Sequence, residues 1–141
     1  MERPAHDLAA LMLRASLGVM WITHGLLKLV VYKLEGFEQF LAANGLPTFI
    51  ALPTVAAELI GGALILAGVR GRWVSLALLP VLVGATSVHL ANGWVFSNEG
   101  GGWEYPVFLI AMSLVHALLG DGRYSLGGLC PKGKALHPQT V

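Results

Sequence analysis

The sequence has little charge for its length. Of its 141 residues, 55% are hydrophobic and only 12% are charged, whereas a soluble domain usually carries about 25% charged residues. The mean hydropathy is +0.69. A chain with so little polar surface could not cover itself as a soluble domain, so the composition predicts a small polytopic membrane protein in contact with the lipid bilayer.

Cysteine and clustered basic residues are also scarce. Cys130 is the single cysteine, which excludes an intrachain disulfide and a Cys-x-x-Cys redox pair within this chain. With a formal net charge of +1, the chain has no basic face with the positive charge density that nucleic-acid binding needs. We therefore expect no nucleic-acid partner and no dithiol chemistry.

Long apolar segments are what the sequence does contain. Each is about 17 to 25 residues, the length that crosses a bilayer core as a helix, and each is continuous rather than alternating, which favours helices over strands. The segments are residues 8–32, 49–69, 73–91 and 103–119. They predict an all-α fold: one antiparallel bundle of four transmembrane helices within residues 1–126, followed by a polar tail at 127–141.

The connections between these segments differ in character. Residues 33–48 are amphipathic and predict a short interfacial helix that ends at Gly45. Residues 70–72 form a turn so short that the helices on either side must be antiparallel neighbours. The chain after Gly120 is polar and is predicted to be extended and solvent-exposed.

The basic residues predict the orientation. With four spans, both termini lie on the same side as the 70–72 turn, and that side carries Arg3, Arg70, Arg72, Arg123, Lys132 and Lys134. The opposite side has Lys33, joined by Lys28 if that side chain extends outward. The positive-inside rule then places both termini in the cytoplasm and the first and third loops on the outer side of the cell inner membrane.

Several ionisable residues interrupt the apolar segments, each at a cost of roughly 2.5 to 3.5 kcal/mol on insertion scales. They are Arg14, His24, Lys28, Glu58, His89, Glu104 and His116. At about 100° per residue, Arg14, His24 and Lys28 fall with Trp21 within an arc of about 80° on the first helix. Such a polar stripe is expected to face the bundle interior.

Depth and charge suggest that part of this set forms one cluster. The groups expected in or near the outer half of the bundle are His24, Lys28, Glu58, His89 and Glu104. Pairing Glu58 with Lys28 or Arg14 would offset much of the cost of burying both charges. His116 lies about 120° around its helix from Glu104 and toward the cytoplasmic side, so it is expected outside the cluster.

Structural roles compete with a binding site at these positions. The charges could be ion pairs that fix helix register, and Lys28 and Glu104 could extend to the membrane surface. Tyr105 could be an interfacial anchor or a hydroxyl donor to the site. Because no helix carries a His-x-x-x-His or Glu-x-x-His pair, we expect neither haem nor a metal.

The order of short motifs resembles the DoxX family of four-helix membrane proteins. The motifs are "LRASLGVMWITHGLLKL", "AAELIGGALILAGVRGRW", "HLANGW", "GGWEYPVFLI" and "LLGDGRYSL", spread over residues 11–126. The family includes proteins similar to a membrane subunit of thiosulfate:quinone oxidoreductase. The resemblance therefore implies a quinone-associated redox role, and the positions that match its polar pattern are Arg14, His24, Lys28, Glu58, His89 and Glu104.

From these observations we expect a redox subunit with an outward-facing polar pocket. The expected quinone-binding residues are Arg14, Trp21, His24, Lys28 and Tyr105, and the expected catalytic residues are His24, Lys28, Glu58, His89 and Glu104. His24 and Lys28 would stabilise a quinone oxygen, while Glu58 and Glu104 would orient them or relay protons.

No residue type here carries electrons, so a partner protein or bound cofactor must supply them. A membrane scaffold or assembly factor is the main alternative function. A small-solute or proton conduit is the other, and with four helices per copy it would require a homo-oligomer.

Overall fold

The computed structural model describes residues 2–129, and every regular element in that range is helical. The longer helices are α1 (Glu2–Leu26), α2 (Lys33–Ala43), α3 (Ala51–Ala67), α4 (Gly71–His89) and α5 (Glu104–Leu119). Shorter elements complete the chain: the π-helical η1 (Leu27–Val31), the 3-10 turns η2 (Thr48–Ile50) and η3 (Leu90–Asn92), and α6 (Leu126–Leu129). The predicted all-α class is confirmed for the described residues.

Three helical segments are long and apolar enough to cross a membrane. They are Pro4–Val31, Thr48–Ala67 and Gly71–Asn92. The fourth predicted span is helical and apolar as α5, but it has only 16 residues. At about 1.5 Å per residue it is shorter than a hydrocarbon core of about 30 Å. That α5 also crosses the membrane therefore stays a prediction.

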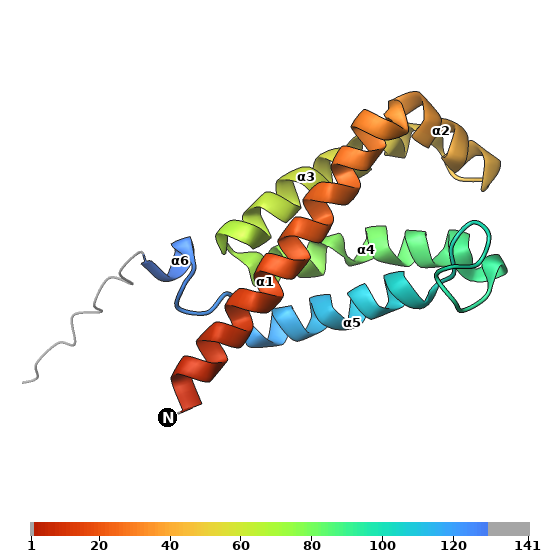
Figure 1. Ribbon diagram of the computed structural model, residues 1–141. Helices are drawn as coiled ribbons and strands as arrows, with labels where there is room; N and C mark the ends of the chain where they lie inside the picture. The colour runs from red at the N-terminus through yellow and green to blue at the C-terminus, as the bar shows by residue number, and fades with distance from the viewer. Residues whose placement is uncertain (1, 130–141) are drawn as a thin grey trace, which may run out of the picture.

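The helices form two arms that diverge toward one end (Figure 1). α1 packs against α3 in one arm, and α4 packs against α5 in the other. Between the arms, Leu17 and Trp21 of α1 meet Leu78 and Leu82 of α4 in the apolar core. The N-terminus and α6 lie at the end where the arms meet, whereas α2 and the loop after η3 lie at the end where they separate.

Glycines allow α1 and α3 to approach closely. A Cβ at Gly62 would lie 2.8 Å from the Trp21 Cβ, and a Cβ at Gly25 would lie 2.8 Å from the Leu59 side chain. Both distances are below van der Waals contact, so a larger residue would push the helices apart. The helix predicted in the first loop is present as α2, and its C-terminal turn is followed by Gly45 with a φ of 71°; its place at the membrane surface stays a prediction.

The π-helical η1 joins α1 to α2 without a break in the helical chain. Its backbone hydrogen bond runs from the Tyr32 N–H to the Leu27 carbonyl at 3.0 Å, an i to i+5 spacing. Lys33 then adopts a φ of 59°, a left-handed conformation uncommon for a residue with a Cβ. The chain turns sharply there, so that α2 leaves the direction of α1.

The chain after Gly120 was predicted to be extended and exposed; the structure shows turns and the short α6 there, and most of the described side chains are exposed, but the segment is tied to the bundle. The Asp121 carboxylate accepts from the Gly71 N–H at 2.9 Å, and the Arg123 N–H donates to Asp7 at 3.0 Å. Ser125 is 2% exposed. The segment supplies polar partners that the bundle end would otherwise lack. The remainder of the predicted tail, from Cys130 to the C-terminus, lies outside the described residues.

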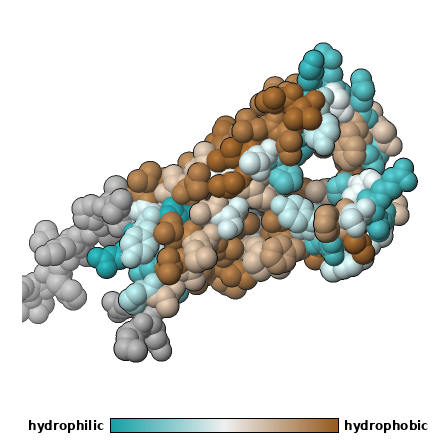
Figure 2. All heavy atoms as spheres, in the orientation of Figure 1, coloured by the Kyte–Doolittle hydropathy of each residue, from teal (hydrophilic) through white to brown (hydrophobic). Residues whose placement is uncertain are grey.

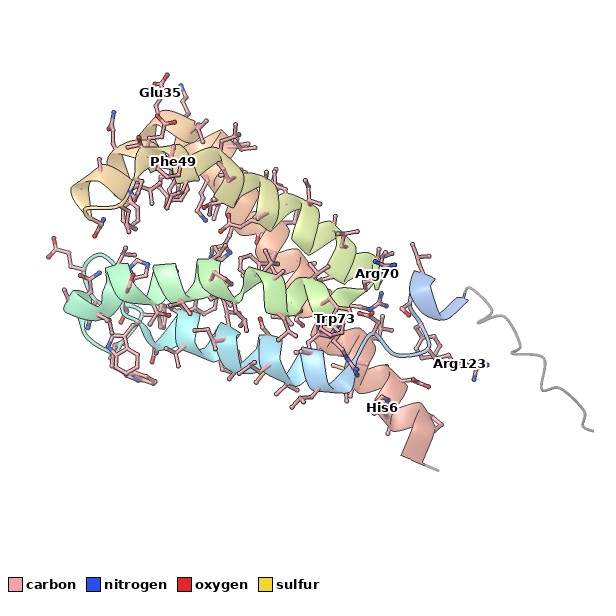
Figure 3. All side chains as sticks on the ribbon, turned by 180° about the vertical axis from the view of Figure 1, so that it is seen from behind. His6, Glu35, Phe49, Arg70, Trp73 and Arg123 are labelled. Carbon is pink, nitrogen blue, oxygen red and sulfur yellow. The ribbon has the colours of Figure 1, made fainter. Side chains whose placement is uncertain are left out.

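Hydrophilic side chains gather at the two ends of the molecule, and hydrophobic ones cover much of its middle (Figure 2). Seen from behind, Arg70 and Arg123 lie at the end near α6, and Glu35 lies at the opposite end beside α2 (Figure 3). This distribution matches a membrane protein whose ends contact water.

Candidate functional site: a pocket between the two arms

A cavity of about 380 Å³ lies where the two arms separate. Its walls come from α1, η1, α2, α3, α4 and α5. Most of the lining is apolar, and the polar lining residues are His24, Lys28, Thr54, Glu58, His89 and Tyr105, with the indole of Trp21 beside them. Figure 2 shows the opening between the arms.

Lys28 and Glu58 form an ion pair in the pocket wall. The Lys28 ammonium donates to both carboxylate oxygens of Glu58, at 2.7 and 2.8 Å. The side chains are 19% and 4% exposed, respectively. The ammonium also lies 5.2 Å from the centre of the Phe37 ring on α2, within range of a cation–π interaction. Of the two partners that the sequence offered for Glu58, the structure selects Lys28.

His24 presents one ring nitrogen to a backbone carbonyl and leaves the other available. Its Nδ1 lies 2.9 Å from the Met20 carbonyl oxygen. Because a carbonyl oxygen only accepts, Nδ1 must carry the hydrogen, so Nε2 of the neutral ring is an acceptor. The imidazole stacks on Tyr105, with ring centroids 5.9 Å apart and an interplanar angle of 24°.

Trp21 provides a buried donor without an acceptor. The side chain is 2% exposed and lines the pocket, and its Nε1–H has no hydrogen-bond partner among the described residues. Buried indole N–H groups usually find a partner. An acceptor atom on a molecule in the pocket would supply one.

His89 and Tyr105 complete the polar lining from the other arm. His89 is the last residue of α4, and Tyr105 is in the first turn of α5. In the described part of the chain, neither the imidazole of His89 nor the hydroxyl of Tyr105 makes a hydrogen bond. One cavity is thus lined by an ammonium, a carboxylate, two imidazoles and a phenol, which come from α1, η1, α3, α4 and α5.

Two residues of the expected site lie elsewhere. Arg14 is 3% exposed and donates to the carbonyls of Leu66 at 2.9 Å and Tyr124 at 2.7 Å, so it joins α1 to the end of α3 and to the tail segment. The Glu104 carboxylate accepts from the Phe96 N–H at 2.9 Å and holds the loop before α5. Neither side chain lines the pocket.

His116 is part of a second buried polar cluster at the end where the arms meet. Its Nδ1 lies 2.7 Å from the Ser75 hydroxyl, and its Nε2 lies 3.4 Å from the Asp121 carboxylate. His116 and Ser75 are both fully buried. His116 was expected outside the outer polar cluster, and it does not line the pocket.

Comparisons with known proteins identify the family of the chain. The DoxX family profile matches residues 9–91, and 128 residues align at 33% identity with a protein of Bacillus subtilis (strain 168) named "Putative oxidoreductase CatD". That alignment covers 91% of each chain. The chain belongs to the DoxX family. No solved structure gives a significant match to this DoxX protein.

The DoxX match includes part of the site. It covers His24, Lys28, Glu58 and His89, and it ends before Tyr105. The pocket of this DoxX protein therefore combines residues inside the matched segment with three from α5, which are Tyr105, Pro106 and Leu109.

Sequence reasoning missed the wall that α2 contributes to the site. Phe37, Phe40 and Leu41 line the pocket, and their i, i+3, i+4 spacing places them on one face of a helix. The amphipathic pattern of residues 33–48 contains this spacing, but from the sequence it was interpreted only as a helix lying at the membrane surface. Gly84 and Ala85 of α4 were also missed, because small residues in an apolar helix carry no signal of a cavity.

In the described residues, no three side chains of His, Cys, Asp or Glu come together as a metal-binding group. The polar residues that line the pocket can form hydrogen bonds, stabilise charge and exchange protons.

Proposed function

We propose that this DoxX protein is a quinone-associated subunit of a membrane oxidoreductase and that the pocket between its arms holds the quinone head group. The observation that carries the proposal is that Trp21, a residue that lines the cavity, has a buried indole N–H without an acceptor in the described chain. A quinone ring has two carbonyl oxygens, which accept hydrogen bonds. The name of the Bacillus subtilis relative, an oxidoreductase, also supports this class.

The donor set of the pocket fits such a ligand. Trp21 Nε1, the Tyr105 hydroxyl and the Lys28 ammonium are donors, and the remaining wall is mostly apolar. A cavity of about 380 Å³ is within the range of sites for small molecules and cofactors. When bound, a quinone would supply the two-electron redox chemistry that the chain's own side chains lack.

Each polar residue has a distinct role in this proposal. Lys28 provides positive charge at the ligand, and Glu58 holds the ammonium in place and keeps the buried pair neutral. His24 can exchange a proton at Nε2, because Nδ1 is committed to the Met20 carbonyl. Electrons would come from a partner protein.

We place the protein in the cell inner membrane with both termini in the cytoplasm and α5 as a fourth span. Arg70 and Arg123 at one end and the acidic Glu35 at the other support this orientation. The N-terminus and α6 lie at the same end of the bundle, as an even number of spans would require.

Binding of a quinone to the purified protein in lipid nanodiscs tests the proposal. A short-chain benzoquinone is titrated while tryptophan emission is recorded, and we expect a saturable quenching component that is absent from Trp21→Phe. Tyr105→Phe should weaken this binding about fivefold to tenfold, because one hydrogen bond is worth about 1 kcal/mol. Tyr124→Phe is the matched control, since that side chain is 58% exposed at the other end of the bundle.

Two results would contradict the proposal. One is the absence of any saturable component in the wild type, and the other is an unchanged affinity in Tyr105→Phe. If His24→Ala and Glu58→Ala instead lower the folded yield and leave quinone binding intact, the polar cluster serves the bundle as a scaffold. Mass spectrometry of material purified from native membranes would identify a partner protein that co-purifies.

A further inference from the structure

Gly84 is unlike the other glycines of the membrane-spanning helices. It lies in the interior of α4, where glycine costs about 1 kcal/mol relative to alanine. A Cβ built at Gly61 or Gly62 would meet a neighbouring side chain at 2.8 Å, so helix packing explains those glycines. A Cβ at Gly84 would have no atom within 4 Å. Close packing therefore does not explain Gly84.

The empty space beside Gly84 belongs to the pocket. Gly84 lines the cavity, as do Val81, Ala85 and Val88 on the same face of α4. Phe37 and Phe40 of α2 line the same cavity. The space between these aromatic side chains and the small Gly84 and Ala85 of α4 is called the slot below.

This slot opens to the side of the bundle. The elements against which α2 packs are η1, η2 and α3, and the space-filling view shows a gap between α2 and the arm of α4 (Figure 2). Phe40, which lines the slot, is apolar and 41% exposed. Glu35 points away from the gap (Figure 3). A lateral opening with apolar edges would face lipid rather than water.

Two of the polar lining groups lie deep in the pocket, because Trp21 is 2% exposed and Glu58 is 3% exposed, whereas Phe40 at the slot and Tyr105 on α5 are each 41% exposed. A ligand that fits this arrangement has a polar head that reaches Trp21 and an apolar chain for the slot. We propose that the ligand is a membrane-resident amphiphile that enters sideways between α2 and α4, and that Gly84 keeps the slot open for its tail. This inference rests on the proposed function, because it takes the head group to be a quinone.

The test fills the slot and compares two probes that share one head group. Gly84→Leu places a side chain into space that is empty in the structure. Binding of a dimethoxybenzoquinone without a tail and of the same head group with a decyl tail is measured in nanodiscs of fixed lipid content. We expect Gly84→Leu to weaken binding of the tailed probe about tenfold and to change binding of the tailless probe less than about twofold.

Two variants control for effects on folding and on helix chemistry. Gly36→Leu makes the same change in α2 at a residue that does not line the pocket, where the nearest atom to a new Cβ is 3.8 Å away; it should bind both probes as the wild type does. Gly84→Ala adds only a methyl group and should keep binding of the tailed probe. If Gly84→Leu does not fold, Ala85→Leu on the same wall is measured in its place.

The possible failures are distinguishable. If the wild type binds both probes and Gly84→Leu affects neither, the lateral slot is wrong and the quinone pocket stands. If Gly84→Leu weakens both probes equally, Gly84 contacts the head group and the tail route is overturned. If the wild type binds neither probe, the proposed function fails, and this inference fails with it.

Discussion

The two ends of the bundle both bury polar side chains, and they do so in different surroundings. Where the arms meet, Arg14 donates to two carbonyls and His116 Nδ1 lies beside the Ser75 hydroxyl, while Arg14 Nε and His116 Nε2 have no hydrogen-bond partner in the described chain. Where the arms separate, Lys28 and Glu58 pair with each other at the edge of a cavity. Trp21 also has a donor without an acceptor in the described chain, and its side chain lines that cavity.

This difference shows that an ionisable residue at membrane depth does not by itself indicate a ligand site. Arg14 is as deeply buried as Glu58, at 3% exposure each, yet only Glu58 lines a cavity. What distinguishes the pocket end is space next to the polar groups. Substitutions at the closed end should therefore change stability alone, and substitutions at the open end should change binding as well.

The largest expected effect comes from breaking the buried ion pair. Glu58→Leu leaves the Lys28 ammonium without its partner and should lower the free energy of unfolding in mixed micelles by about 3 kcal/mol. The double variant Lys28→Met/Glu58→Leu removes both charges and should recover most of that stability, while quinone binding stays lost. A double variant as unstable as Glu58→Leu would show that the pair is not the source of the effect.

A smaller loss of stability is expected at the closed end. Arg14→Met removes two hydrogen bonds that join α1 to Leu66 and to Tyr124, and it should cost about 2 kcal/mol. The affinity for quinone should stay within about twofold of that of the wild type. Arg123→Met is the matched control, because its side chain is exposed and only its backbone N–H bonds to Asp7. A large loss of affinity in Arg14→Met would remove the distinction between the ends.

The smallest effect is expected at the second polar cluster. His116→Ala leaves the Ser75 hydroxyl without its partner and should lower the free energy of unfolding by about 1 kcal/mol. His6→Ala, at an exposed histidine near the N-terminus, should change it much less. Thermal unfolding of the two variants in one detergent measures the difference, and a change in quinone binding by His116→Ala would contradict the assignment.

Much of the fold could be predicted from hydropathy because the bilayer restricts a spanning chain to helices of defined length. α3 and α4 lie within one to three residues of their predicted segments. Orientation toward a shared interior could also be predicted for His24 and Lys28, since a fixed angle per residue places them on one face of α1. Both of them line the pocket.

The errors arose where partners come from distant parts of the chain. Arg14 shares the polar face of α1, but the carbonyls that hold it belong to residues 66 and 124, which no helical periodicity connects. For the same reason the segment after Gly120 was predicted to be exposed, although Ser125 is 2% exposed. The divergence of the arms, and therefore the cavity, depends on tertiary packing that the sequence pattern does not report.

The π-helical η1 makes the pocket wall tolerant of the loss of one residue. A π-turn accommodates one residue more than the α-helical turn it replaces. Deleting one residue between Leu27 and Val31 would let this turn close as an α-helical turn, and the chain beyond it would keep its facing direction. Phe37 and Phe40 would then stay on the face that lines the pocket. A deletion within α1 has no such turn to absorb it and would rotate the helix on one side of it by about 100°.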